Sequence, residues 1–333
     1  MLVVTNLWPY EGDPSYGCFV RDQMESLGRL GVAHDVLFIN GRESRGNYFR
    51  SAFSLRRMLR AERYDLVHAH MGLAGLVARL EWQAPLVVTF LGNDVMGRFS
   101  HPGRTTLYDW FFRASSFALA RLAREVIVQS QEMRTKLGLA RAHVISNGID
   151  LSVFRPLDRR QACRDLGLDP GKKYVLFPYH PAQTWKRYDL AEAAVKQARE
   201  QVPELELLTV SRRPRAEVPR WMAAADCLVH ASEVEGSPNT VKEALAMNLP
   251  VVAVRVGDTP ELLTGVEGCF LVPRDSKAIA LAIIEVVRRG SRIHGQESVE
   301  RFSMENVARQ VYEVYLAALG RTAAHRAKAG AQL

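Results

Sequence analysis

A chain of 333 residues is long enough for about two domains, each with a sizeable hydrophobic core. Its composition, 47% hydrophobic with 24% charged and 8% aromatic residues, excludes intrinsic disorder and collagen-like structure. The 44 basic and 36 acidic side chains give a net charge of +8, which is a hint about partners and does not identify one.

The four cysteines are far apart in the sequence, and no pair has the spacing of a metal site or a redox motif. They are therefore predicted to be free thiols in a reducing compartment. The apolar run at residues 1–7 lacks a basic start and a cleavage site, so it predicts a buried strand rather than a targeting segment. No uncharged apolar stretch approaches the ~20 residues that span a bilayer, so we expect any membrane contact to be peripheral.

Short apolar runs alternate with amphipathic helical patterns in the first half of the chain, which is typical of βαβ units around a parallel sheet. Helical patterns lie at residues 20–30 and 107–122. The predicted strands are 2–5, 35–39, 66–69, 86–90, 125–129 and 143–145. Residues 1–155 are therefore predicted to form one Rossmann-like domain.

An arginine-rich stretch lies between the second and third of these strands, and phenylalanine, leucine and methionine are interleaved with its charges. Its basic residues are Arg42, Arg45, Arg50, Arg56, Arg57, Arg60 and Arg63. Two interpretations stay open. The stretch is either a solvated helix whose apolar stripe packs on its own domain, or a basic face that meets an anionic membrane surface.

The pattern restarts after a turn-rich segment at residues 146–150, and we place the domain boundary after Arg155. Residues 156–303 are predicted to form a second Rossmann-like domain with strands at 174–177, 205–210, 227–230, 251–254 and 269–272. A helix within 304–320 is expected to pack back on the first domain, and the Ala- and Lys-rich tail 321–333 is expected to be frayed. Two such domains are expected to face a cleft at the carboxyl ends of their strands.

The most informative window follows the strand at 227–230. Ser237 and Pro238 are predicted to be the N-cap and first residue of a helix, whose free N–H groups favour a phosphate or pyrophosphate. Two carboxylates, Glu235 and Glu243, bracket this helix start. Asn239 and Glu243 are four residues apart and share a helix face, so one element can bind a nucleotide.

These residues resemble the retaining glycosyltransferases of family 4, which have the GT-B fold of two Rossmann-like domains. The hallmark of that family is two glutamates separated by seven residues, as Glu235 and Glu243 are here. The resemblance extends over nearly the whole chain, through segments 3–6, 15–20, 65–70, 87–90, 146–150, 249–252, 257–261 and 302–307. It implies an α/β GT-B fold whose first domain takes the acceptor and whose second domain takes the nucleotide-sugar donor.

The resemblance also implies a role for each matching residue of the second domain. Glu235 would bind hydroxyl groups of the donor sugar near the reacting carbon, and Glu243 would bind the ribose hydroxyls. Gly236 and Ser237 would offer backbone amides to the donor. Asn239 would join them on the donor-binding face.

Three further positions are implied to meet the donor phosphates. Gly17 would let its loop approach them closely, because glycine has no side chain. Lys186 would be the second catalytic residue, since a mobile ammonium can follow the charge that develops on the leaving phosphate. The arginine that accompanies this lysine in the family is absent, and Gln183 stands in its place; Arg212 or Arg213 could compensate.

A second departure lies in the first domain, where many family members have a histidine before the glycine of a His-Gly-x-Asp run. This chain has Leu91, Gly92, Asn93 and Asp94 instead. Asn93 and Asp94 are expected on the acceptor side. The alternative for Asp94 is an ordinary helix cap.

The sequence therefore predicts a glycosyltransferase that moves a sugar from a nucleotide-diphosphate sugar to a glycan or lipid-linked acceptor, with retention of configuration. Surface polysaccharide biosynthesis is the expected pathway, without a cofactor or metal, in the cytoplasm or peripherally on the inner face of the membrane. The alternatives are a catalytically impaired GT-B subunit that binds a nucleotide sugar or a partner, because of Gln183, and a GT-B nucleotide-sugar epimerase. Nucleic-acid binding is disfavoured, because no recognition motif accompanies the charge.

Overall fold

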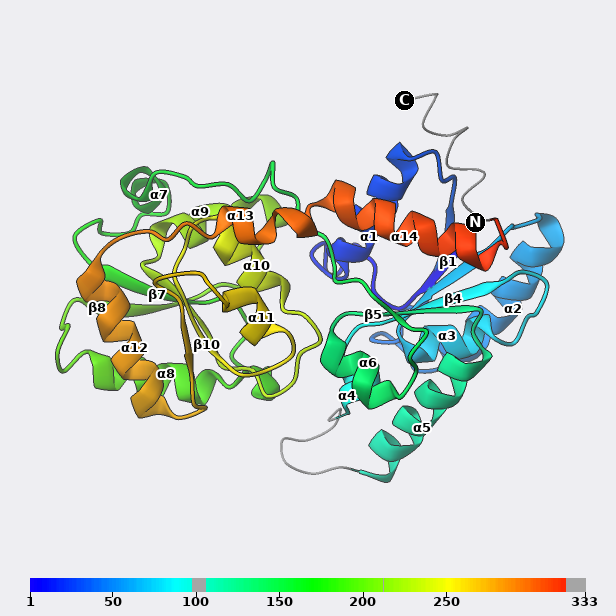
Figure 1. Ribbon diagram of the computed structural model, residues 1–333, viewed down its shortest axis with the longest axis horizontal. Helices are drawn as coiled ribbons and strands as arrows, with labels where there is room; N and C mark the ends of the chain where they lie inside the picture. Colours follow the sequence, from blue (N-terminus) through cyan, green and yellow to red (C-terminus); the bar gives the residue numbers. More distant parts are fainter. Residues whose placement is uncertain (98–105, 212, 322–333) are drawn as a thin grey trace. The chain divides into compact units, whose positions relative to one another are not determined.

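The computed structural model describes residues 1–97, 106–211 and 213–321, and it divides into two compact units (Figure 1). Unit 1 contains Met1–Gly148 and the chain from Met304 onward, and unit 2 is Ile149–Ser303. The boundary thus falls earlier than our placement after Arg155. The physical reason is that Ile149 and Phe154 are fully buried in a hydrophobic core of unit 2.

The described part of unit 1 holds a six-stranded parallel sheet in the order β2-β1-β3-β4-β5-β6. Its strands are β1 Leu2–Thr5, β2 Asp35–Phe38, β3 Val67–His70, β4 Leu86–Phe90, β5 Glu125–Val128 and β6 His143–Val144. The inner strands are buried on both faces because helices cover both sides, as is usual for parallel sheets.

Helices lie on both faces of this sheet (Figure 1). The helices of unit 1 are α1 Cys18–Arg29, α2 Asn47–Ala61, α3 Gly72–Ala78, α4 Asn93–Met96, α5 Leu107–Leu122, α6 Gln131–Leu137 and α14 Met304–Ala318. Val3 and other alternate strand residues pack with α1 and α14, whereas Leu2 and Val4 face the opposite side, where α2, α3 and α5 lie. The last long helix therefore packs on unit 1.

Local signals in the sequence fix several helix ends. Thr106 and Asp109 form a capping box at the start of α5, with each side chain bonded to the other residue's backbone N–H. Ser130 caps α6, and Gly138 ends it in the left-handed conformation that a glycine adopts without strain.

Unit 2 holds a five-stranded parallel sheet in the order β11-β10-β9-β7-β8 within its described residues. Its strands are β7 Lys173–Phe177, β8 Leu205–Thr209, β9 Cys227–His230, β10 Val251–Val254 and β11 Phe270–Val272. This is a doubly wound order: β8 lies on one side of β7, and the later strands β9, β10 and β11 are added on the other side, so the strand order reverses between β7 and β9.

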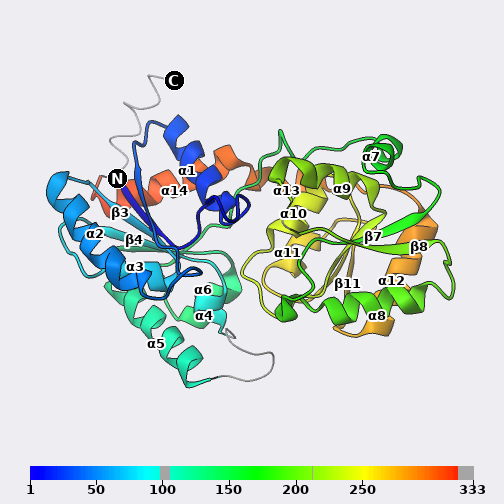
Figure 2. The ribbon, with the colours of Figure 1, turned by 180° about the vertical axis from the view of Figure 1, so that it is seen from behind.

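The helices of unit 2 also pack on both faces of its sheet, as Figure 2 shows from behind. They are α7 Arg159–Asp165, α8 Tyr188–Ala198, α9 Val218–Ala224, α10 Asn239–Ala246, α11 Thr259–Leu263, α12 Ser276–Arg289 and α13 Gln296–Val299, with short 3₁₀ turns η1 Thr184–Lys186, η2 Arg215–Glu217 and η3 Glu300–Phe302. Helices α8 and α12 cover one face, and α7, α9 and α10 contribute to the core on the other.

The predicted α/β class with two Rossmann-like parallel sheets is confirmed, and every predicted strand is present with its ends shifted by one residue at most. One local prediction is wrong. Pro238, with extended ψ of 111°, is the N-cap of α10 and has no side-chain cap bond, so Ser237 lies one position outside the cap. Residues 322–333 of the predicted tail lie outside the described residues. Among the helices that the structure describes, none combines the length and apolarity needed to cross a membrane.

Candidate functional site

The carboxyl edge of the sheet in unit 2 is where a ligand site is expected, because the strand order reverses between β7 and β9. The loop after β7 covers residues 178–187, and the loop after β9 covers residues 231–238. The two loops are bonded to each other, since the Glu233 N–H donates to the Trp185 carbonyl at 2.8 Å. Residues predicted from two separate motifs therefore lie together.

Lys186 and Glu235, the two predicted catalytic residues, form an ion pair with 2.5 Å between Nζ and Oε1. Only 14% and 15% of their side chains are exposed. The Lys186 ammonium also lies 4.0 Å from the centre of the Tyr179 ring, a cation–π contact. Burial acts to raise the pKa of Glu235, but the charge and hydrogen bond of Lys186 outweigh it and lower the pKa, so the carboxylate stays ionised.

Arg187 fixes the end of the loop after β7. Its φ of 59° places a non-glycine residue in the left-handed region, which costs about 1–2 kcal/mol. Two ion pairs hold it there, with Asp189 at 2.6 Å and Glu233 at 3.3 Å. The strained turn thus ties Lys186 to the loop that carries Glu235.

Two buried side chains, Tyr179 and His230, lie near this ion pair with the half-buried Thr240, and no sequence pattern indicates them. The Tyr179 hydroxyl lies 2.8 Å from Nδ1 of His230 and 2.5 Å from Oγ1 of Thr240. Nε2 of His230 lies 3.9 Å from Oε1 of Glu235. Burial lowers the pKa of His230 to about 4, although the Glu235 carboxylate opposes the shift, so the imidazole is neutral near pH 7.

Glu243 lies on α10 and is paired with Arg215, with 3.0 Å between Oε1 and Nη1. Its side chain is only 5% exposed, so the guanidinium compensates a carboxylate with little water around it. Arg215 belongs to η2, which follows β8, and its guanidinium lies 5.0 Å from the centre of the Phe154 ring. A second ion pair therefore lies beside the second turn of α10.

The loop that leads into α10 is held by the turn after β10. Gly257 has a φ of 53°, and a Cβ there would lie 2.6 Å from the carbonyl oxygen of Gly236. Only glycine allows this backbone contact. Ser237 is buried and its side chain bonds Asp258, so Gly236 and Ser237 are packed against the neighbouring turn.

Lys242 and Asp258 form a further charged pair behind the start of α10. Lys242 is fully buried, with its ammonium 5.3 Å from the centre of the Phe302 ring. Burial lowers the pKa of Lys242 to about 8 and raises that of Asp258 to about 6, and the attraction between the two groups opposes both shifts. The sequence reasoning missed both residues.

Buried polar atoms without a hydrogen-bond partner gather around α10. Within the described part of the chain they include Oδ1 of Asn239, Nε2 of His230 and Oδ1 of Asp258. Buried polar groups in folded proteins are normally bonded, so such a cluster indicates a place where a ligand or ordered water completes the bonding.

Gln183 lies where a cation was expected. It is the N-cap of η1, and its N–H donates to the His180 carbonyl at 2.9 Å. Of the two arginines proposed to compensate, Arg212 lies outside the described residues, and the Arg213 guanidinium lies 5.6 Å from the centre of the Trp221 ring. The cation that the structure places beside α10 is Arg215, which the sequence reasoning overlooked.

Gly17 is the N-cap of α1 in unit 1, with a φ of 65°. A Cβ at this position would lie 2.2 Å from the carbonyl carbon of Leu7 and 2.5 Å from the nitrogen of Trp8. The absence of a side chain is therefore already required by packing within the unit. Its predicted contact with donor phosphates stays a prediction.

Asn93 and Asp94 lie at the start of α4, after β4. The carboxylate of Asp94 is fully buried and accepts the N–H groups of Leu91 at 3.1 Å and Gly92 at 3.0 Å. Burial raises the pKa of Asp94 to about 6, although these bonds oppose the shift. Asp94 thus bonds the backbone before the helix, although the N-cap of α4 is Gly92 and has no side-chain cap bond. The acceptor-side role of Asn93 and Asp94 stays a prediction.

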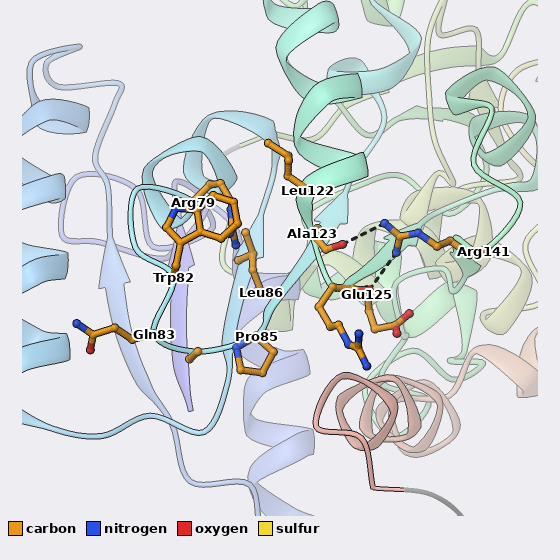
Figure 3. Close-up of a pocket in the computed structure, with 11 residues that line it drawn as sticks. Arg79, Trp82, Gln83, Pro85, Leu86, Leu122, Ala123, Glu125 and Arg141 are labelled. Atoms are coloured by element: carbon orange, nitrogen blue, oxygen red, sulfur yellow. Dashed lines mark hydrogen bonds between the residues drawn. The ribbon is translucent and has the colours of Figure 1, made fainter.

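A pocket of about 740 Å³ lies in unit 1 where β4 and β5 begin, at the edge opposite their carboxyl ends (Figure 3). Arg141 lines it, but its guanidinium donates to three main-chain carbonyls at the end of α5. Arg79, at the end of α3, lies 2.8 Å over the centre of the Trp82 ring. These cations complement the negative ends of two helices, so we assign no substrate to this pocket.

Two family models match the chain in consecutive regions. Glycosyltransferase Family 4 matches residues 12–153, and Glycosyl transferases group 1 matches residues 184–289. The first covers most of unit 1, and the second begins within the loop after β7 and includes Lys186, Glu235 and α10.

Two curated relatives are also glycosyltransferases by name. A D-inositol 3-phosphate glycosyltransferase of Nocardioides sp. is 27% identical over 327 residues, covering 78% of this chain and 70% of that protein. A protein assigned to teichuronic acid biosynthesis as the glycosyltransferase TuaC of Bacillus subtilis is 27% identical over 249 residues, covering 69% of this chain and 63% of that protein.

Among solved structures, HepE of Anabaena in complex with UDP-glucose has a TM-score of 0.67 to this chain. The two are 18% identical, and the match covers 94% of this chain and 98% of that one. This likeness supports the fold of both units.

Proposed function

Because the chain belongs to glycosyltransferase family 4, we propose that it transfers a sugar from a nucleoside diphosphate sugar to a glycan or lipid-linked acceptor, with retention of anomeric configuration. The relative HepE was solved with UDP-glucose, which supports a nucleotide-sugar donor. The single observation that carries the proposal is the carboxyl edge of unit 2. There, the pairs Lys186–Glu235 and Arg215–Glu243 flank the start of α10.

The donor diphosphate is proposed to lie at the start of α10. The first N–H groups of a helix and the positive end of its dipole favour a phosphate, and Lys186 and Arg215 add two cations beside it. The unpartnered Oδ1 of Asn239 offers an acceptor for a donor hydroxyl. Glu243, about four residues or ~6 Å further along the helix, is at a suitable distance for the ribose hydroxyls.

The reaction breaks the bond between the anomeric carbon and the diphosphate oxygen, and the electron pair passes to the phosphate. The acceptor hydroxyl oxygen forms the new bond to the anomeric carbon, and its proton passes to the departing diphosphate. Lys186 is proposed to stabilise the charge on the leaving phosphate, while Glu235 binds hydroxyl groups of the donor sugar. Because two side-chain cations and the N–H groups at the start of α10 can stabilise the negative charge of the leaving diphosphate, we propose that no metal ion or other cofactor is required.

A second candidate function is favoured by Gln183. A neutral side chain there removes one charge-assisted contact to the leaving group, which could cost about 2–4 kcal/mol of transition-state stabilisation. The chain would then be a subunit that binds a nucleotide sugar or a partner without transfer. Arg215 argues for the active enzyme, because it supplies a cation from another loop.

The biological setting is proposed from the relatives. One of them is assigned to teichuronic acid biosynthesis and another acts on D-inositol 3-phosphate, as their names state. We therefore propose a role in surface polysaccharide biosynthesis, carried out in the cytoplasm or at the inner face of the membrane.

The arginine-rich stretch from Arg42 to Arg63 supports contact with an anionic membrane surface. Helix α2 buries Leu55 and Leu59 in unit 1, as the first interpretation predicted. It also exposes Phe49 by 79% and Phe53 by 73%. These two rings form an outer stripe with the exposed residues Arg56 and Arg60, at spacings of four, seven and eleven residues from Phe49. Exposed aromatic rings beside arginines suit a surface of anionic lipid headgroups.

Co-sedimentation with vesicles tests this surface contact. Vesicles rich in phosphatidylglycerol should bind the protein, and vesicles of phosphatidylcholine should not. Binding should weaken at high salt, in an Arg56→Gln, Arg57→Gln, Arg60→Gln variant and in a Phe49→Ala, Phe53→Ala variant. The matched control is Leu281→Ala, which removes an exposed apolar side chain from α12 in unit 2. Binding that is absent, or unaffected by salt and by both variants, would refute the contact.

The proposed reaction is tested with a panel of UDP-, GDP- and ADP-sugars, offered with glycan and polyprenyl-phosphate-linked acceptors. Release of nucleoside diphosphate and labelled product from one donor is the expected result. Binding of a donor by calorimetry without release from any of them would favour the non-transferring subunit. If no nucleotide sugar binds, both candidate functions are wrong.

A further inference from the structure

His230 ends β9 and is fully buried beside the predicted catalytic pair, yet the proposed reaction leaves it without a role. Its Nδ1 lies 2.8 Å from the Tyr179 hydroxyl. Its Nε2 has no hydrogen-bond partner in the described part of the chain and lies 3.9 Å from Oε1 of Glu235. A buried nitrogen without a partner is costly, so its place beside a carboxylate needs an explanation.

The hydrogen bonds on the other side of the ring allow a proton on either nitrogen. Burial raises the pKa of Tyr179 well above its usual range, so the phenol keeps its proton, and His230 is neutral with one proton on its ring. If Thr240 donates to Tyr179 and Tyr179 donates to Nδ1, the proton of His230 is on Nε2. If both bonds run the other way, the proton is on Nδ1.

The charge of Glu235 distinguishes the two tautomers. With the proton on Nε2, an N–H group points toward an ionised carboxylate. With the proton on Nδ1, a bare nitrogen lone pair would face that negative charge at 3.9 Å, which is repulsive. Electrostatics therefore favours the Nε2–H tautomer, and the hydrogen-bond chain is compatible with it.

We propose that His230 is a positioning residue that holds Glu235 through an Nε2–H bond when Lys186 turns to the donor diphosphate. The inference rests on the proposed function, in which the ammonium leaves its 2.5 Å bond to Glu235 for the phosphate. The mostly buried carboxylate would then keep its polar contact with the Ser232 side chain but lack Lys186 as a partner. Closing the distance from 3.9 Å to about 2.9 Å gives it a new one, and a small side-chain rotation is enough.

Tyr179 contacts both Lys186 and His230 in this arrangement. Its ring lies under the Lys186 ammonium, and its hydroxyl lies 2.8 Å from Nδ1 of His230. Tyr179→Phe removes the hydroxyl and keeps the ring, while Glu235 still faces Nε2. The variant therefore tests whether Glu235 alone is enough to hold the proton on Nε2.

The first test measures the tautomer and does not depend on activity. In the full-length protein with ¹⁵N-labelled histidine, long-range ¹H–¹⁵N spectra distinguish the two neutral tautomers, and His230→Gln assigns the signal. The expected result is Nε2–H in the wild type and also in Tyr179→Phe, because the Glu235 carboxylate is present in both. A ring protonated on Nδ1 in either protein would overturn the proposal.

The second test separates positioning from packing. His230→Gln keeps an amide N–H near the place of Nε2, whereas the matched variant His230→Asn places its amide near Nδ1. We expect His230→Asn to lower kcat about 10-fold to 100-fold with an unchanged affinity for UDP, and His230→Gln to restore most of it. Equal activity of the two variants, or loss of thermal stability and UDP binding in step with kcat, would overturn the role.

A failure of the proposed function is distinguishable from a failure of this inference. If the wild type transfers no sugar from any donor, the proposed reaction is wrong. If His230 carries its proton on Nδ1, only the proposed role of His230 is wrong.

Discussion

Arg215 illustrates how charge at a site can come from a residue outside the motif. The family motif predicts an arginine at position 183, where this chain has a glutamine, and Arg212 or Arg213 after β8 was the expected replacement. The structure instead pairs Arg215 with Glu243 at 3.0 Å. Which of three neighbouring arginines reaches α10 depends on the path of η2, and sequence spacing does not determine that path.

Arg215→Ala should weaken the binding of nucleoside diphosphates. The change removes a cation beside α10 and leaves Glu243, with 5% of its side chain exposed, without a counterion that offsets its repulsion of phosphate. We expect the Kd for UDP, measured by calorimetry, to rise about 10-fold to 100-fold. The matched control is Arg213→Ala, which removes an arginine near Trp221 and should change Kd little. Equal effects of the two variants would contradict the assignment of Arg215 to the donor site.

The predictable and unpredictable parts of the site differ in their chemistry. Lys186, Glu235 and Glu243 stand out because charged residues recur at defined spacing. Tyr179 and His230 look like ordinary ends of buried strands, and they meet only because β7 and β9 are neighbours in the sheet. No local pattern encodes that contact.

The helix α14 is anchored to unit 1 by polar contacts as well as by its apolar face. The hydroxyl of Tyr315 lies 2.6 Å from Nδ1 of His68 on β3, and Nε2 of His68 lies 2.7 Å from Oγ1 of Thr89 on β4. The His70 ring stacks on His68 with 4.2 Å between centroids, and its Nε2 lies 3.2 Å from Oε1 of Gln23. A buried histidine cluster therefore joins α14 and α1 to the sheet.

Unit 1 should lose stability as the pH falls below about 6.5. Burial lowers the pKa of His70 to about 3 and that of His68 well below its usual value, whereas the unfolded chain takes up these protons near pH 6.5. Stability from these groups is thus fully present above pH 6.5 and declines as the pH falls toward the folded values. His70 should contribute a loss of about 2 kcal/mol between pH 7.5 and 5, and His68 a further loss of the same sign.

Urea unfolding at pH 7.5 and pH 5 measures this dependence. His70→Gln, which keeps an amide near Gln23, should lose about 2 kcal/mol less than the wild type over this interval. The exposed His294, replaced by glutamine, serves as the control and should leave the dependence unchanged. The same pH dependence in His70→Gln and the wild type would show that His70 is not the group that resists protonation.

At the level of elements, strands were predicted well because buried parallel strands have short, continuous apolar runs between turns. Helix starts were harder to predict. The Ser237–Pro238 pair satisfies the usual preferences for an N-cap and first turn, yet the chain enters α10 one residue later. Packing of Gly236 and Ser237 against Gly257 and Asp258 overrides the local preference.

The predicted boundary between the two domains was also misplaced, because a contact between distant residues decides where unit 2 begins. The turn-rich segment at 146–150 looked like part of the first domain, with the boundary after it. Ile149 enters the core of unit 2 and its N–H donates to the Phe302 carbonyl at 2.7 Å, where the chain is about to leave that unit. The first and last residues of unit 2 are therefore in contact, although they lie far apart in the sequence.

The central claim for the whole molecule is that sugar transfer depends on Glu235 and its partners at the carboxyl edge of unit 2. The most direct measurement is the rate of nucleoside diphosphate release from the accepted donor by the wild type, Glu235→Gln and Glu267→Gln. Glu267 is the matched control, because it is a glutamate of the same unit that is 85% exposed and pairs with Arg289. We expect Glu235→Gln to lose about 100-fold or more and Glu267→Gln to keep most of its rate. A Glu235→Gln enzyme that transfers sugar as fast as the wild type, or equal losses in the two variants, would contradict the account.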